Sequence, residues 1–219
     1  IDVLSNDTDV DGDVLTIANA TVPAEHGTVA VVDGKIQFTP AVDFNGTATI
    51  SYTVSDGTDT TAGSVAVTVT AVNDAPVASD DAAQTTDENT VLNTSVPVAT
   101  DVDGTIDSYQ VVTTVSEGSL TFNPDGSYSF DPGADFDDLA VGESRAVTFT
   151  YTATDNNGAV SSSKTVTITV TGSNDAPVVI NETATVIEDG GVTIIDVLSN
   201  DTDVDGDVLT IANATVPAE

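Results

Sequence analysis

The residues most able to do chemistry lie in a short acidic stretch. The sequence NDTDVDGD occupies Asn6 to Asp13 and returns unchanged at Asn200 to Asp207. Carboxylates this close repel one another and cannot pack into an apolar core, so the loop needs water or a cation. Asp at positions one, three and five, followed by Gly, is the first half of an EF-hand loop, and calcium takes about six to eight oxygen ligands. The twelfth position is Ala18, which excludes an EF-hand. The stretch is therefore either a calcium-binding loop or a solvated acidic surface.

The composition limits the partners of the chain. Three Lys+Arg stand against 36 Asp+Glu in 219 residues, which gives a formal charge of −33. Nucleic acid is therefore excluded as a partner, and no direct contact with an anionic membrane is expected. Cysteine is absent and His26 is the single histidine, so disulfides, thiolate sites and histidine metal clusters are excluded too. Such a chain needs counter-charge from solution, either divalent cations or high salt.

Internal repeats divide the chain. Residues 195–219 are identical to residues 1–25, and Asn-Asp-Ala-Pro at 73–76 returns at 174–177. Two alternating unit types explain both repeats. We predict that residues 1–76 are the later part of a first unit type, residues 77–177 a whole unit of a second type, and residues 178–219 the earlier part of the next first-type unit. The chain is therefore expected to open and close inside units of a longer array.

Apolar residues alternate with polar ones, as in half-buried strands. The pattern is clear in residues 64–70, 147–153 and 166–170, and Asp-Gly and Asn-Gly turn signals separate such segments. No segment shows a useful helical stripe. The chain is predicted to be all-β, with tandem seven-stranded, Ig-like antiparallel β-sandwiches. A complete first-type unit would join the end of the chain to its beginning, with strands at 178–187, 192–198, 208–212, 28–32, 35–39, 47–55 and 62–72.

Counting strand reversals places each acidic loop at the pole that meets the preceding linker. Hard cations could then be shared between neighbouring units. The first predicted junction gathers Asn73, Asp74, Asp101, Asp103 and Asp155, and is expected to be the most complete. The second gathers Asn174, Asp175, Asp201, Asp203 and Asp205, with Glu88 from the far pole of residues 77–177. The remaining candidates are Asp7, Asp9, Asp11 and Asp56, whose linker partner is not in the sequence.

These motifs together resemble a known family. Asp56-Gly57, or Asp155 to Gly158, followed by a Thr/Val strand and Asn-Asp-Ala-Pro, is similar to the closing pattern of bacterial cadherin-like repeats. Residues 77–177 resemble the VCBS repeat, in Thr100 to Gly104 and Thr171 to Asp175 among other segments. The resemblance implies cadherin-like sandwiches in the extender region of a large secreted adhesin of the RTX-type, biofilm-associated kind, with calcium at the junctions. Because the linker offers fewer ligands than animal cadherin linkers, fewer ions per junction are expected.

The predicted function is therefore structural. We expect an extender module at the bacterial cell surface, rigidified by Ca²⁺, that projects a distal binding domain for adhesion or biofilm formation. Its partners would be neighbouring repeats, with strand exchange between copies at the split repeat. The alternative is a carbohydrate- or ligand-binding module, although Tyr52, Tyr128 and Tyr151 are expected to be buried. An enzyme is not expected, because no carboxylate pair is visibly set in an apolar pocket.

Overall fold

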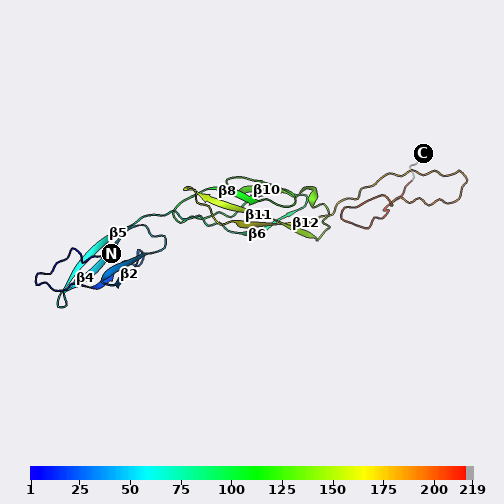
Figure 1. Ribbon diagram of the computed structural model, residues 1–219. Helices are drawn as coiled ribbons and strands as arrows, with labels where there is room; N and C mark the ends of the chain where they lie inside the picture. Colours follow the sequence, from blue (N-terminus) through cyan, green and yellow to red (C-terminus); the bar gives the residue numbers. More distant parts are fainter. Residues whose placement is uncertain (216–219) are drawn as a thin grey trace. The chain divides into compact units, whose positions relative to one another are not determined.

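Strands dominate the computed structural model, which describes residues 1–215 (Figure 1). The chain divides into two compact units, Ile1–Asp74 and Ala75–Glu219, called unit 1 and unit 2 below. Among the described residues the only helical element is the 3-10 turn η1, Gly133–Asp135. The all-β, Ig- and cadherin-like fold class is confirmed, whereas the three-part division of the chain stays a prediction.

Unit 1 contains two small sheets. Strands β1 (Thr16–Thr21), β4 (Gly46–Ser55) and β5 (Thr60–Val69) form one sheet in the order β1-β4-β5. Strands β2 (Gly27–Val32) and β3 (Lys35–Pro40) form the other. Asp33 and Gly34 join them with φ angles of 49° and 72°, the left-handed conformation that a tight hairpin needs. Val3, Ile36 and Ile50 are the buried centre of the unit.

Unit 2 holds a complete sandwich of seven strands. One sheet has the order β6-β12-β11-β8, and the other has the order β7-β10-β9. The strands are β6 (Asp81–Asp87), β7 (Leu92–Ser95), β8 (Ile106–Thr113), β9 (Ser119–Phe122), β10 (Ser127–Asp131), β11 (Ser144–Asp155) and β12 (Lys164–Thr171).

One pairing in unit 2 corrects the expectation of a purely antiparallel sandwich. Strand β6 pairs with β12 in parallel, and the labels β6, β11 and β12 lie together in Figure 1. The reason is topological. In a sandwich of seven strands that reverse direction one after another, the first and the last run the same way, so they are parallel when they become neighbours.

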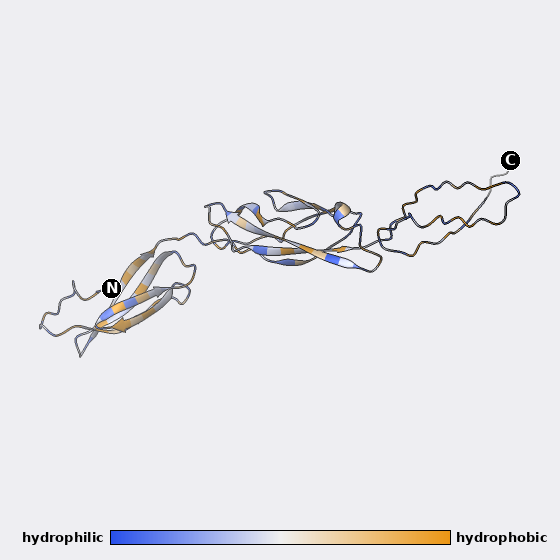
Figure 2. Cartoon of the chain, turned by 45° about the vertical axis from the view of Figure 1, so that its right-hand side comes forward, coloured by the Kyte–Doolittle hydropathy of each residue, from blue (hydrophilic) through white to orange (hydrophobic). Residues whose placement is uncertain are grey.

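Aromatic residues fill the core of unit 2. Phe149 is fully buried and meets the rings of Tyr128 and Phe122 edge-on at 5.0 and 5.9 Å. Tyr151 is also fully buried, and its hydroxyl donates to the Ser79 carbonyl at 2.6 Å. Hydrophobic and hydrophilic residues alternate along the strands of both units (Figure 2). Burial of Tyr128 and Tyr151 agrees with the expectation from sequence, whereas Tyr52 is only partly buried.

Residues 173–215 differ from the prediction. The strands expected at 178–187, 192–198 and 208–212 are not formed, and an isolated bridge between Val178 and Thr202 is the one ladder contact seen in this part of the described chain. Strands need a neighbour for their backbone groups, and no described segment pairs along these residues beyond that bridge. None of the described residues forms a helix that is long and apolar enough to cross a membrane.

The core of unit 2 gives a first test. Phe149→Ala should lower the free energy of unfolding of unit 2 by about 3–5 kcal/mol, because the neighbouring rings cannot refill the space. Urea unfolding followed by the near-ultraviolet signal of the tyrosines measures it. Val98, which is 84% exposed in the same unit, is the control, and Val98→Ala should change stability by less than about 0.5 kcal/mol. Equal losses in the two variants would show that this core does not hold the sandwich.

Candidate metal site

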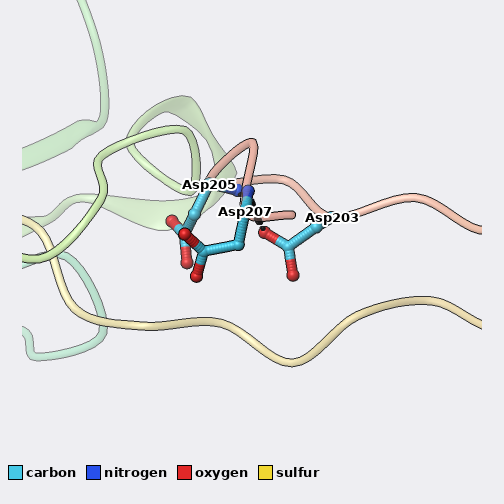
Figure 3. A group of neighbouring side chains, drawn as sticks. All are labelled: Asp203, Asp205 and Asp207. Atoms are coloured by element: carbon cyan, nitrogen blue, oxygen red, sulfur yellow. Dashed lines mark hydrogen bonds between the residues drawn. The ribbon is translucent and has the colours of Figure 1, made fainter. Parts of the chain in front are cut away.

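The acidic loop of unit 2 folds around one carboxylate. Oδ1 of Asp203 accepts hydrogen bonds from the backbone N–H groups of Asp205 and Asp207, at 3.1 and 3.3 Å. Gly206 has a φ of 78°, which explains the glycine in the motif. One carboxylate oxygen from each of Asp203, Asp205 and Asp207 consequently lies within 4.8 Å of the other two, and Figure 3 shows the three side chains turned toward a common space. An array of this kind offers only oxygen donors, which suit a hard divalent cation.

The identical loop in unit 1 has the same backbone hydrogen bonds, although among the described residues the grouping of three carboxylates is found only at Asp203, Asp205 and Asp207. Oδ1 of Asp9 accepts from the N–H groups of Asp11 and Asp13, at 2.8 and 3.1 Å. Gly12 has a φ of 84°. Side-chain to backbone bonds of this local kind depend on residues only two to four positions apart. The sequence of the loop therefore sets its backbone hydrogen bonds in both places.

A buried carboxylate from the turn after β6 supplies the second feature of the site. Glu88 is only 2% exposed. Its Oε1 accepts hydrogen bonds from the N–H and the hydroxyl of Ser173, at 2.7 and 2.8 Å. Its Oε2 is buried and has no hydrogen-bond partner among the described residues. Burying such an oxygen is costly unless a hydrogen bond or a positive charge compensates it.

The linker brings the acidic loop toward Glu88. The N–H of Asp175 donates to Oδ2 of Asp205 at 2.7 Å, and Oδ1 of Asp205 is buried without a hydrogen-bond partner in the described chain. Burial, and then the negative charges of Asp205, Glu88, Asp137 and Asp203, raise the pKa of the Asp175 carboxyl above its usual value. The ion pairs seen among the described residues belong to Lys35 and Arg145 and do not reach this cluster. Within the described chain, no ion pair with a lysine or arginine compensates its negative charge.

The other two residues predicted for this junction organise the backbone. Oδ1 of Asp201 accepts the N–H of Ile180 at 2.8 Å. The side-chain amide of Asn174 donates to the carbonyl of Asp175 at 2.6 Å. Both bonds hold the linker and the loop in the conformation that presents Asp175 and Asp205.

Two acidic residues of the site were missing from the predicted ligands. Asp207 belongs to the carboxylate group, and Asp137 contributes to the raised pKa of Asp175. Alternation of Asp at every second position from Asp203 is a sequence signal that points to Asp207. Asp137 comes from the segment between η1 and β11, and no local motif places it here.

At the opposite pole of unit 2, the predicted loop lies against the predicted turn. The N–H of Thr105 donates to Oδ1 of Asn156 at 2.7 Å. Asp155 is 2% exposed and accepts backbone N–H groups of the turn. Asp101 accepts the N–H of Asp103 at 3.1 Å, while its Oδ2 is buried without a hydrogen-bond partner among the described residues. This half of the first junction therefore also holds an uncompensated carboxylate oxygen.

Asn73 and Asp74 end unit 1, whereas Asp101, Asp103 and Asp155 belong to unit 2. Their grouping around one ion stays a prediction.

The last candidates lie together in unit 1. Oδ1 of Asp56 accepts the N–H groups of Thr58 and Asp59, both at 2.7 Å. These two bonds lower the pKa of Asp56. A cleft of about 400 Å³ is lined by Asp56 together with Asp7 and Asp9 of the acidic loop. Asp11 follows in the same loop.

Comparison with known domains agrees with this architecture. Residues 1–70 match a cadherin-like domain, residues 73–172 a bacterial cadherin-like domain, and residues 174–219 a bacterial Ig domain. Bacterial cadherin-like and bacterial Ig domains are thus found in the chain. Domains of these kinds are typically non-enzymatic, extracellular modules with structural or adhesive roles. The predicted cadherin-like resemblance is confirmed, whereas the VCBS and RTX adhesin assignments stay predictions.

One solved structure shows a similar fold. The EC1-2 fragment of human protocadherin-24 (form II) is 21% identical, with a TM-score of 0.50 over 75% of this chain and 85% of that chain. Drosophila N-cadherin EC1-3 is 19% identical over 74% of this chain and 55% of that chain, with a TM-score of 0.33. An endo-fucoidan hydrolase of glycoside hydrolase family 107 is 17% identical, with a TM-score of 0.28, over 74% of this chain but only 24% of its own. The TM-scores of the last two structures are too low to support an argument. No curated protein matches the sequence significantly.

The crowded carboxylates around Asp175 predict that the stability of the folded protein depends on pH. With its raised pKa, Asp175 binds a proton more tightly in the folded, metal-free protein than in the unfolded chain. Stability at this site should therefore fall as pH rises from the usual Asp range through the raised pKa. Carbon-detected NMR titration in chelator should show a pKa for Asp175 above 3.8, the usual value for an aspartate.

The Asp205→Asn variant shows how much of the raised pKa of Asp175 comes from the neighbouring charge and how much from burial. It should lower the pKa of Asp175, because among the neighbouring carboxylates the charge of Asp205 raises that pKa most. Asp138 is the control, since its pKa is lowered by the Arg145 side chain and not by this cluster. An Asp175 pKa that does not move in Asp205→Asn would contradict the coupling of the two carboxylates.

Proposed function

We propose that the chain is a structural extender module of a secreted bacterial cell-surface adhesin, rigidified by calcium. The observation that carries the proposal is the convergence of Glu88, Asp175 and Asp205 in unit 2. Two of their carboxylate oxygens are buried and lack a hydrogen-bond partner among the described residues. The Asp203 and Asp207 carboxylates adjoin Asp205.

The donor set favours calcium. All candidate ligands are carboxylate, amide or backbone oxygens, and calcium accepts about six to eight such ligands in flexible geometry. Magnesium demands a near-octahedral shell and gives up its water reluctantly. A loop that supplies carboxylates from alternate positions, together with a linker and a distant turn, suits the larger and less directional ion.

The cation would act on the mobility of the linker. In its absence the carboxylates of the acidic loop, the linker and the turn after β6 repel one another, so the loop is pushed away from the sandwich. A bound cation would replace this repulsion by attraction, because carboxylates from all three segments would then coordinate the same ion. Extracellular modules of this type bind calcium at about 10⁻⁴–10⁻³ M. Secreted concentrations would therefore keep the linker stiff.

The wider role follows from repetition. Neighbouring repeats in the same chain would be the partners of each calcium site, and a row of stiff junctions would hold a distal binding domain away from the cell for adhesion or biofilm formation. The acidic pole with Asp101, Asp103 and Asp155 is proposed as the half of an equivalent site, to which Asn73 and Asp74 would contribute. The cadherin-like and bacterial Ig matches support this reading.

Calorimetric titration of the metal-free protein with calcium tests the proposal. Glu88→Gln keeps the shape of the side chain but removes its charge, and it should weaken one class of sites about tenfold or more, equivalent to about 1.4 kcal/mol. Hydrogen exchange at residues 173–178 and 203–207 should slow with calcium in the natural sequence and not in Glu88→Gln.

Glu182→Gln is the matched control, because Glu182 is exposed; its titration should match that of the natural sequence. Absence of calcium binding by the natural sequence, or an unchanged affinity in Glu88→Gln, would refute the proposed site. Magnesium is titrated in parallel, and we expect weaker binding.

A further inference from the structure

Unit 2 places one of its two cationic side chains beside an acidic segment. Residues 132–143 join β10 to β11 and are called the β10–β11 connection below. This connection carries four carboxylates, at Asp135, Asp137, Asp138 and Glu143. Arg145 follows it in β11 and forms both ion pairs seen in the described part of unit 2. The other cation, Lys164, begins β12.

Arg145 holds the β10–β11 connection at several points. Its Nη2 donates to Oδ2 of Asp138 at 2.7 Å, and its Nη1 donates to the Asp135 carbonyl at 3.0 Å. The guanidinium carbon lies 5.5 Å from the centre of the Phe136 ring. Glu117, from the loop between β8 and β9, accepts a longer bond from Nη1 at 3.4 Å. A planar guanidinium can satisfy such partners together, which the compact ammonium of a lysine cannot do.

The hydrophobic core fixes the other side of the connection. Phe136 is fully buried and Leu139 is 5% exposed. The Phe136 ring meets that of Phe130 edge-on at 6.2 Å, and the N–H of Leu139 donates to the Phe136 carbonyl at 3.0 Å. The path of the connection is therefore set by the core on one side and by Arg145 on the other.

Gly172, the first residue after β12, lies directly against this connection. Its N–H donates to the carbonyl of Glu143 at 3.0 Å. A Cβ on Gly172 would overlap the carbonyl oxygens of Leu139 and Ala140. Glycine allows two backbones to approach this closely because it has no Cβ. The β10–β11 connection therefore positions the start of the linker.

The next residue of the linker contacts Glu88. The N–H and the hydroxyl of Ser173 donate to Oε1 of Glu88, and the side-chain amide of Asn89 donates to the same hydroxyl at 2.9 Å. The N–H of Glu88 donates to the Thr171 carbonyl at 3.0 Å. Residues 171–173 are thus bonded to the turn after β6 as well as to the β10–β11 connection.

We propose that Arg145 is a positioning residue of the candidate metal site. By holding the β10–β11 connection in place, it fixes the backbone of Gly172 and Ser173, and through Ser173 the carboxylate of Glu88. Among the described residues its ion pairs are with Asp138 and Glu117, so it acts without touching the carboxylates of the site. That Arg145 orders the linker is independent of any metal, whereas its effect on calcium affinity rests on the function proposed above.

The charge of Arg145 and its contacts have opposite effects on cation binding. A positive charge near a cation site repels the cation, so loss of the charge alone should tighten calcium binding. Loss of the contacts should weaken calcium binding, because Glu88 would no longer be held in place. The sign of the change in affinity therefore distinguishes a positioning role from a purely electrostatic one.

Hydrogen exchange measured by NMR in chelator tests the positioning without any metal. In Arg145→Met, the amides of Gly172 and Ser173 should exchange at least about tenfold faster than in the natural sequence, because the groups that accept their hydrogen bonds are no longer fixed. Lys164→Met is the matched control, since it removes an equal charge from the opposite end of β12, and it should leave both amides unchanged. Unchanged exchange in Arg145→Met would overturn the proposal, whatever the protein does with calcium.

Calorimetric titration measures the effect on the site. Arg145→Met should weaken calcium binding by about tenfold. Arg145→Lys keeps the charge but not the planar fork, so it should weaken binding too, and it replaces the methionine variant in both experiments if that variant does not fold. Lys164→Met should bind calcium at least as tightly as the natural sequence. Urea unfolding establishes that each variant is folded during the titration, and a tighter calcium site in Arg145→Met would contradict the positioning role.

A double variant shows whether Arg145 acts through Glu88. Arg145→Met added to Glu88→Gln should weaken calcium binding much less than Arg145→Met does alone, because the carboxylate that it positions is already gone. Full additivity of the two effects would exclude the route through Glu88. Absence of calcium binding by the natural sequence would refute the proposed function, and the exchange rates of Gly172 and Ser173 would still decide whether Arg145 orders the linker.

Discussion

Repulsion between carboxylates at the pole of unit 2 is the interaction on which the candidate metal site depends. Backbone N–H groups of the linker bring Asp175, Asp205 and Glu88 together, and no lysine or arginine ion pair of the described residues reaches them. Their proximity costs free energy in the absence of a cation. The buried aromatic core of the unit 2 sandwich, where Phe149 and Tyr151 are fully enclosed, stabilises the fold and offsets this free energy.

The sandwich also explains why the acidic groups converge. With seven strands, the chain enters unit 2 at one pole and leaves at the other, so the exit linker lies beside the turn that carries Glu88. Glu88 is fixed by Ser173, two residues before Asp175. The strand count, which also makes β6 parallel to β12, therefore sets the composition of the candidate metal site.

Sequence reasoning succeeded where the determinants are local or periodic. Alternation of apolar residues predicted β11 and β12, and the Asp-Gly signal predicted the turn between β2 and β3, because each depends on neighbouring positions. Glu88 was placed at the far pole by counting strands. Asp137 was missed, since only tertiary packing brings it near Asp175. Residues 178–187, 192–198 and 208–212 have strand patterns but form no strands, because a strand also needs a paired neighbour and no described segment pairs along them beyond the Val178–Thr202 bridge.

The two copies of the duplicated segment show, within one molecule, which features local sequence determines and which depend on tertiary packing. Around Asp9 and around Asp203, the carboxylate accepts the same two backbone N–H groups. A few residues later the copies diverge, because residues 16–21 pair with β4 whereas residues 210–215 pair with nothing described. The ligand-bearing loop is thus built by contacts two to four residues apart, and the strand after it only by a distant surface. A loop that keeps its shape without the strand can present its carboxylates before the sandwich around it is complete.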